Sequence, residues 1–288
     1  MTKNKDEYKE LRSRYKENKR KYREDRFRIK DEKKLELEHR HDDYVIDKLT
    51  IEKPLKAEKY RLKVERKYRN RLLNEAPKRR TLEEIGNSIT HGVGALVGIL
   101  FLVLMILKSH DALSLTAAII YGSCFFLQML FSCLYHAFRS GTKAKRLFRR
   151  FDYSSIYLAL GGTFAPLYLI YMIEKMWGFY WGIGLFAVQW AIIVTGITFV
   201  GVFGPGRLRW LHFTLYFLVG WSAIMFIPTW IRLDLPLFLF ILGGGLTYTL
   251  GMIPFAALKK KTSAHFIWHF VVLAGSILMA TGIYLYVF

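Results

Sequence analysis

Long runs of apolar residues fill the chain from Ser88 onward, and each run is about as long as a membrane-spanning helix. A span needs about 20 mostly apolar residues to cross roughly 30 Å of hydrocarbon. Seven stretches meet that length, at approximately 88–107, 112–136, 153–173, 177–201, 208–231, 235–257 and 265–287. Because these runs are continuous, whereas the strands of a membrane barrel alternate in polarity, the pattern predicts an all-α bundle of seven transmembrane helices.

Charged residues are concentrated ahead of the first apolar run. Residues 1–84 contain 29 Lys and Arg and 19 Asp and Glu, and only 14 basic and 4 acidic residues remain for 85–288. So few charges exclude a water-soluble fold for the second part. We therefore expect a basic N-terminal extension over 1–82 and a membrane domain over 83–288.

The extension has weak apolar stripes and few prolines, which predicts charged helices at about 5–40 and 56–74. Large apolar residues are too few for an independent core, so partial disorder of the isolated segment is the alternative. No removable export signal is expected, because the N-terminus lacks the apolar core of a signal peptide. Two cysteines, Cys124 and Cys133, cannot build a disulfide framework.

The distribution of Lys and Arg between the short loops predicts the orientation. With the N-terminus inside, the outer loops hold only Lys108, Lys175 and Arg232, and the inner loops hold eleven basic residues. These are Arg139, Lys143, Lys145, Arg146, Arg149, Arg150, Arg207, Arg209, Lys259, Lys260 and Lys261. Each is worth about 1 kcal/mol near an anionic leaflet. We therefore expect a cytoplasmic N-terminus and an external C-terminus.

The same electrostatics suggest a partner for the extension. Its basic residues next to the first span, most densely at 59–80, favour attachment to the anionic inner leaflet. The alternative is a solvated extension without a dedicated partner. No nucleic-acid partner is expected, because no binding module accompanies the charge.

Polar side chains within a membrane domain are costly and are therefore candidates for function. On the predicted topology His136 closes the second span, Asp152 opens the third, and His265 and His269 open the seventh. All four then lie at the cytoplasmic ends of their helices. Asp152 is the only acid expected on that side of the apolar core, residues 85–288.

Two local spacings make these residues candidates for a metal site. His265 and His269 are four residues apart, as are Ser132 and His136, so each pair shares one face of a helix. Two histidines from one helix and one from another form a reasonable Zn²⁺ set that leaves a fourth position open, as in catalytic sites. Asp152 is then the candidate proton acceptor. The alternative is that the histidines reach toward headgroups and Asp152 only caps its helix.

Four segments together resemble the hemolysin III family. They are Glu83–Gly92 (EEIGNSITHG), Ser132–His136 (SCLYH), Asp152–Pro166 (DYSSIYLALGGTFAP) and His265–His269 (HFIWH). That family belongs with the progestin and adipoQ receptors and is more distantly similar to alkaline ceramidases. The resemblance covers about 82–288 and implies a multi-pass protein of a bacterial-type plasma membrane.

The resemblance implies a cytoplasmic-side zinc held by His136, His265 and His269, with Asp152 and Ser132 as catalytic residues. For function it implies a zinc-dependent hydrolase of lipid amide or ester bonds; a cytolytic, pore-forming protein and a membrane-homeostasis sensor or receptor with a structural zinc are the alternatives. In this chain Met279 stands where many members have a further histidine. His91 has two open interpretations, a wall of the zinc cavity or a hydrogen bond to a neighbouring helix. His110 and His212 are expected to be structural or exposed.

Overall fold

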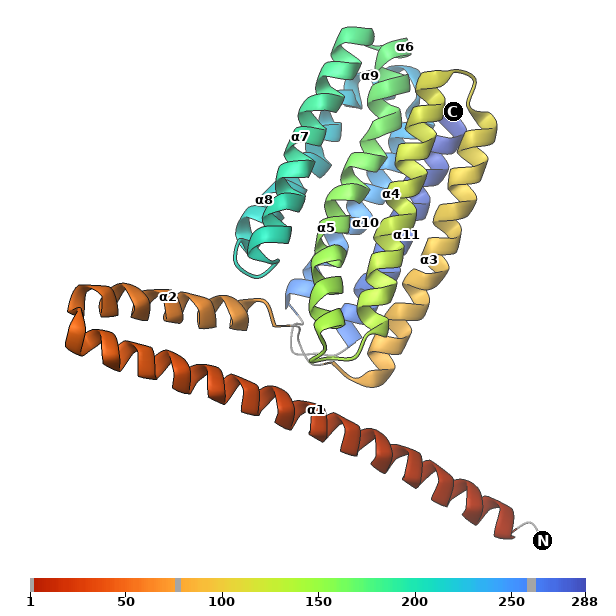
Figure 1. Ribbon diagram of the computed structural model, residues 1–288. Coiled ribbons are helices and arrows are strands. Elements are labelled where there is room, and N and C mark those ends of the chain that lie inside the picture. The colour runs from red at the N-terminus through yellow and green to blue at the C-terminus, as the bar shows by residue number, and fades with distance from the viewer. Residues whose placement is uncertain (1–2, 76–78, 258–262) are drawn as a thin grey trace. The chain divides into compact units, whose positions relative to one another are not determined.

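A computed structural model describes residues 3–75, 79–257 and 263–288, in which the regular structure is helical throughout. The chain divides into two compact units, Met1–Leu72 and Leu73–Phe288 (Figure 1). The first unit holds the charged helices and the second holds the apolar ones.

Two helices make up the charged unit, α1 (Lys3–Glu52) and α2 (Pro54–Leu73). The helical prediction for this region is confirmed, but α1 runs past the expected end at residue 40. Neither Gly nor Pro interrupts the sequence before Pro54. Pro54 then begins α2, where its missing N–H would lack a helical partner in any case. Attachment of this unit to an anionic membrane surface stays a prediction.

A buried carboxylate holds α1 and α2 together. Asp42 on α1 accepts hydrogen bonds from three α2 side chains, at 3.0 Å from the Tyr60 hydroxyl, 3.0 Å from Lys67 Nζ and 2.9 Å from the Tyr68 hydroxyl. The ring of His39 stacks on Tyr68 with centroids 3.9 Å apart. Burial works to raise the pKa of Asp42, but these hydrogen bonds outweigh it and hold the pKa below its ordinary value.

The second unit contains the membrane spans. Among the described residues, seven helical segments are long and apolar enough to cross a bilayer, which confirms the predicted number. In order they are α3 (Thr81–Lys108); α4 (Ala112–Ala137); α5 (Lys143–Pro166) with the π-helical turn η1 (Leu167–Met172) and α6 (Ile173–Lys175); α7 (Phe179–Phe203); α8 (Arg209–Trp221) with the 3₁₀ turn η2 (Ser222–Phe226) and α9 (Ile227–Leu233); α10 (Leu235–Ala257); and α11 (Ser263–Tyr286).

The third span differs most from its predicted bounds. It begins at Lys143 rather than near 153, because the side chain of Thr142 accepts a hydrogen bond from the Lys145 N–H and caps the helix there. Most of the basic run that was expected to be a loop is therefore helical. The inside position of the N-terminus stays a prediction, and Lys259, Lys260 and Lys261, which contribute to it, lie outside the described residues.

Small residues allow α3 and α4 to pack closely. A Cβ atom at Gly98 would lie 2.9 Å from the backbone nitrogen of Phe126, so a larger residue would push the helices apart.

α4 lies between α3 and α5, and α11 packs against both α3 and α10. Asp111 caps α4 through a reciprocal pair with Ser114, and the Ser114 N–H holds the pKa of Asp111 below its ordinary value. The core thus places one end of α3, α4, α5 and α11 together.

The segment that leads into α3 docks on a glycine-containing loop of the same unit. Asn74 donates to the Phe203 carbonyl at 3.1 Å and accepts from the Gly206 N–H at 3.0 Å. A side chain at Gly206 would collide with the carbonyl oxygen of Leu73, and Gly204 has φ +77°, a conformation that favours glycine. The loop between α7 and α8 therefore needs both glycines to accept this segment.

Asp42→Asn should loosen the charged unit. The amide cannot take over the ionic hydrogen bond from Lys67, so we expect hydrogen exchange of α2 amides in the full-length protein to accelerate about tenfold. Because the folded-state pKa of Asp42 is depressed, its contribution is present above the ordinary carboxyl pKa of 3.8 and is lost as the pH falls below that value. Asp43→Asn, at an exposed neighbour, is the control; equal exchange in both variants would contradict the role of Asp42.

Candidate metal centre

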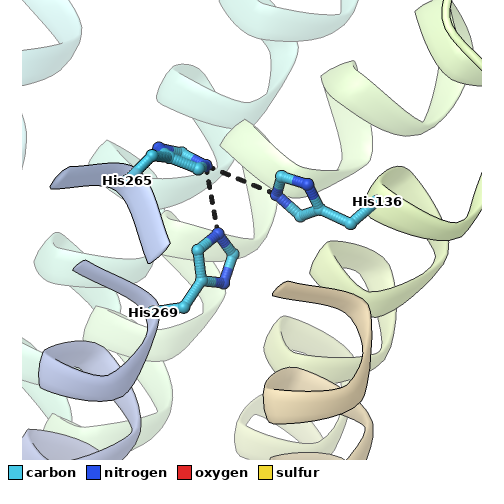
Figure 2. Close-up of side chains that lie close together, drawn as sticks. All are labelled: His136, His265 and His269. Atoms are coloured by element: carbon cyan, nitrogen blue, oxygen red, sulfur yellow. Dashed lines mark hydrogen bonds between the residues drawn. The ribbon is translucent and has the colours of Figure 1, made fainter. Parts of the chain in front are cut away.

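Three histidines converge at one end of the bundle (Figure 2). His136 comes from the last turn of α4, and His265 and His269 come from the first turns of α11. The Nε2 atom of His265 lies 3.5 Å from Nε2 of His136 and 3.1 Å from Nε2 of His269. One nitrogen from each ring lies within 4.8 Å of the other two, which is close enough for all three to hold one metal ion.

The spacing of these nitrogens fits a tetrahedral ion. Histidine nitrogens bind Zn²⁺ at about 2.0–2.1 Å, which places two ligands of a tetrahedron about 3.3–3.4 Å apart. The two Nε2 separations of 3.1 and 3.5 Å lie on either side of that value. His136 and His269 are buried and His265 is half-buried, so water competes little for the site.

A carboxylate fixes the orientation of His136. Glu84, in the first turn of α3, places Oε2 2.7 Å from His136 Nδ1. A carboxylate at that distance retains the proton on Nδ1, and the lone pair of Nε2 is then available to a metal. Asn87 adds a longer contact of 3.5 Å to the same nitrogen.

A buried lysine completes this network. Lys145 Nζ donates to the same Glu84 oxygen at 2.7 Å and lies 4.2 Å from the centre of the Tyr135 ring. Its side chain is fully buried, although it comes from the basic run that the sequence placed in a loop. Lys145 therefore offsets the charge of Glu84, which would otherwise be costly inside the bundle.

Asp152 and Ser132 lie beside the histidines. Both side chains line the cavity that His265 and His269 also line. Asp152 is not among the side chains whose ligand atoms gather within 4.8 Å. The arrangement is compatible with a group that handles protons next to the metal, and the catalytic roles of both residues stay predictions.

Two of these histidines, His265 and His269, line an apolar cavity of about 320 Å³ within the bundle. Side chains of α3, α4, α5, η1, α8, η2, α9, α10 and α11 line it, and most of them are aliphatic or aromatic. Among its polar members are His91 and Gln128. Such a cavity suits an apolar chain whose polar end faces the histidines.

The sequence reasoning missed two members of the site. Glu84 lies one residue before the apolar core for which Asp152 was expected to be the only acid on this side, yet it contacts His136 directly. Glu84 was counted with the charged extension, although Glu84, Asn87 and His91 share a face at i, i+3 and i+7. Lys145 gave no signal, since only tertiary packing distinguishes it from its basic neighbours.

The histidines outside the triad differ in their surroundings. His91 lines the cavity, and neither ring nitrogen has a hydrogen-bond partner within the described ranges, so of its two interpretations the structure favours the cavity wall. His212 is buried and its Nδ1 lies 2.8 Å from the Tyr157 hydroxyl. His110 is exposed, 3.6 Å from Glu174. His212 and His110 are thus structural and exposed, as expected.

Seven spans with three convergent imidazoles define a class, the polytopic membrane proteins with a metal-ligand cluster inside the bundle. The family model described as Haemolysin-III related matches residues 79–280, and the chain belongs to this family. It is similar to Hemolysin-3 of Bacillus cereus, with 35% identity over 209 residues that cover 71% of this chain and 92% of that protein. It is also similar to a Hemolysin-3 homolog of Bacillus subtilis (strain 168), with 32% identity over 201 residues, 68% of this chain and 91% of that protein. The chain is a multi-pass integral membrane protein of the bacterial plasma membrane.

Glu84→Gln should weaken binding of a divalent metal. The neutral amide cannot hold the His136 proton on Nδ1 as the carboxylate does, and loss of such a partner typically lowers metal affinity 10- to 100-fold. Competition for metal between the detergent-purified protein and a chromophoric chelator measures this. Glu83→Gln is the matched control, and equal affinities of the two variants would contradict the assigned role of Glu84.

Proposed function

We propose that this haemolysin III family protein is a zinc-dependent hydrolase of amide or ester bonds in membrane lipids. The observation that carries the proposal is that two members of the histidine triad, His265 and His269, line an apolar cavity. A chain held in that cavity would present its polar end to the three imidazole nitrogens. The triad alone is compatible with a structural or a catalytic metal, and the cavity provides the space for a substrate.

Zinc is favoured by the donor set. Three imidazoles, two pairs of which have nitrogens 3.1 and 3.5 Å apart, suit Zn²⁺, and three protein ligands leave a fourth position open, as in catalytic rather than structural sites. When bound, Zn²⁺ would supply Lewis acidity, which activates water and polarises a carbonyl group. Glu84 supports this assignment because it holds the proton of His136 on the side away from the triad.

The side chains next to the triad supply the remaining functions. Asp152 would accept a proton from the attacking water and pass it to the leaving group, and it lines the same cavity as His265 and His269. Ser132, which lines the same cavity, would help to orient the carboxylate. The apolar walls would exclude bulk water from the reacting bond and hold the acyl chain in register with it.

Two other functions are compatible with parts of the site. The triad joins α4 to α11, so a bound zinc could act as a clamp in a sensor of membrane state. The relatives carry the name Hemolysin-3, which suggests a cytolytic function for this chain as well. A polar pore is disfavoured because mostly apolar side chains line the cavity.

The metal content of the detergent-purified protein is the first test. We expect about one zinc per chain by elemental analysis, lost in His265→Ala and His269→Ala because two ligands hold Zn²⁺ too weakly to survive purification. His110→Ala, at an exposed histidine outside the triad, should keep the metal. A folded wild-type protein that binds no zinc even when zinc is supplied would overturn the hydrolase.

Asp152→Asn separates the hydrolase from the clamp. Loss of a general base should slow hydrolysis of a dye-labelled long-chain lipid amide, or of the matching ester, by about 10²- to 10⁴-fold while zinc content is unchanged. Asp111→Asn is the control, because asparagine caps a helix as well as aspartate does. Turnover by Asp152→Asn at the wild-type rate would exclude Asp152 as the base, and a zinc-loaded wild type without turnover would favour the clamp.

A further inference from the structure

A polar strip runs along α4 from the triad into the cavity. Gln128, Ser132 and His136 are spaced four residues apart and therefore share one face of the helix. His136 belongs to the triad, and Ser132 lines the cavity together with Asp152. Gln128 lies one turn deeper, is only 8% exposed, and lines the cavity. The proposed reaction gives Gln128 no role.

His91 on α3 faces the same region. It is 4% exposed and lines the cavity, and its ring centroid lies 4.0 Å from that of His269. The contacts between α3 and α4 fix its level along the bundle. Ser88, about one turn before His91, donates to the Cys133 carbonyl at 3.1 Å. Gly94, about one turn after His91, packs against Met129. His91 therefore lies between the levels of Ser132 and Gln128.

The state of His91 needs an explanation. Neither Nδ1 nor Nε2 has a hydrogen-bond partner in the portion of the chain that the structure describes. A buried polar group that makes no hydrogen bond destabilises a protein, and native structures rarely retain one without a ligand, a water molecule or a function. Because His91 borders the cavity, its partner is expected to enter from there.

We propose that His91 and Gln128 form a subsite that binds a hydroxyl group of a neutral lipid, next to the bond presented to the triad. A neutral imidazole has one donor and one acceptor, and a glutamine amide has both, so the two residues complement a hydroxyl, which donates once and accepts twice. Neither residue carries a charge that would bind a phosphate or an ammonium group. The inference rests on the proposed function, because it names a feature of the lipid that the hydrolase would select.

Two matched lipids test the subsite by binding rather than by turnover. N-oleoylethanolamine carries a hydroxyl where N-oleoylpropylamine carries a methyl group, and the two molecules are otherwise alike. Displacement of tritiated N-oleoylethanolamine from the full-length protein in nanodiscs gives the affinity of each. We expect the wild type to prefer the hydroxyl lipid about tenfold, the value of one to two net hydrogen bonds.

Variants assign the preference to the two residues. His91→Phe and Gln128→Leu replace each polar group by an apolar one of similar size, and both should bring the ratio of affinities to about one without changing zinc content. Gln189→Leu is the matched control. Gln189 is a glutamine of α7, 5% exposed and not among the side chains that line the cavity, so its variant should keep the preference.

Equal binding of the two lipids by the wild type would overturn the subsite and indicate that water satisfies His91. A preference that persists in either variant that folds, as judged by gel filtration, or that is also lost in Gln189→Leu, would overturn it too. The assay is repeated after removal of metal with a chelator. If the zinc-free wild type still prefers the hydroxyl lipid and binds no zinc when it is supplied, the hydrolase is overturned and the subsite stands. If the wild type binds zinc but does not prefer the hydroxyl lipid, the subsite is overturned and the hydrolase stands.

Discussion

The carboxylate of Glu84 is the interaction on which the site depends. One of its oxygens lies 2.7 Å from both His136 Nδ1 and Lys145 Nζ, so it joins α3, α4 and α5 at one point. The side chains of His136 and Lys145 are buried and that of Glu84 is only 13% exposed, so bulk water offers few replacement partners. Each therefore requires the other two, and the same requirement orients His136 toward His265 and His269. Removing any member would leave an uncompensated polar group among apolar helices.

The same constraint explains why the polar residues are gathered rather than scattered. Glu84, His136 and the two histidines of α11 lie at one end of their helices, and mostly apolar side chains line the cavity. Asp152, which was expected to open the third span, instead lies about two and a half turns inside α5, because that helix already begins at Lys143. Small residues such as Gly98 let α3 and α4 approach, which brings groups on different helices within contact distance. The bundle thus forms a polar end and an apolar interior, and a lipid with a polar linkage matches both.

The charged unit follows different physics. α1 and α2 carry too few large apolar residues to bury a core, and Asp42 with its three hydrogen bonds supplies a specific contact between them. Their helical state could be predicted, because no Gly or Pro interrupts the sequence before Pro54. The pairing of Asp42 with Tyr60, Lys67 and Tyr68 could not, since many charged residues on both helices offered alternatives of similar energy.

The sequence by itself determined the helical class, the number of spans and the three histidines. The length of an apolar run and the i, i+4 spacing are local properties, and the bilayer restricts both the length of a span and the polar residues within it. Only the tertiary structure decided that Glu84 and Lys145 belong to the site, that His91 and Gln128 line one cavity, and that the third span begins at Lys143. These outcomes depend on which helices are neighbours and how they are rotated. Contacts between residues far apart in the chain set both, and no local pattern of polarity encodes them.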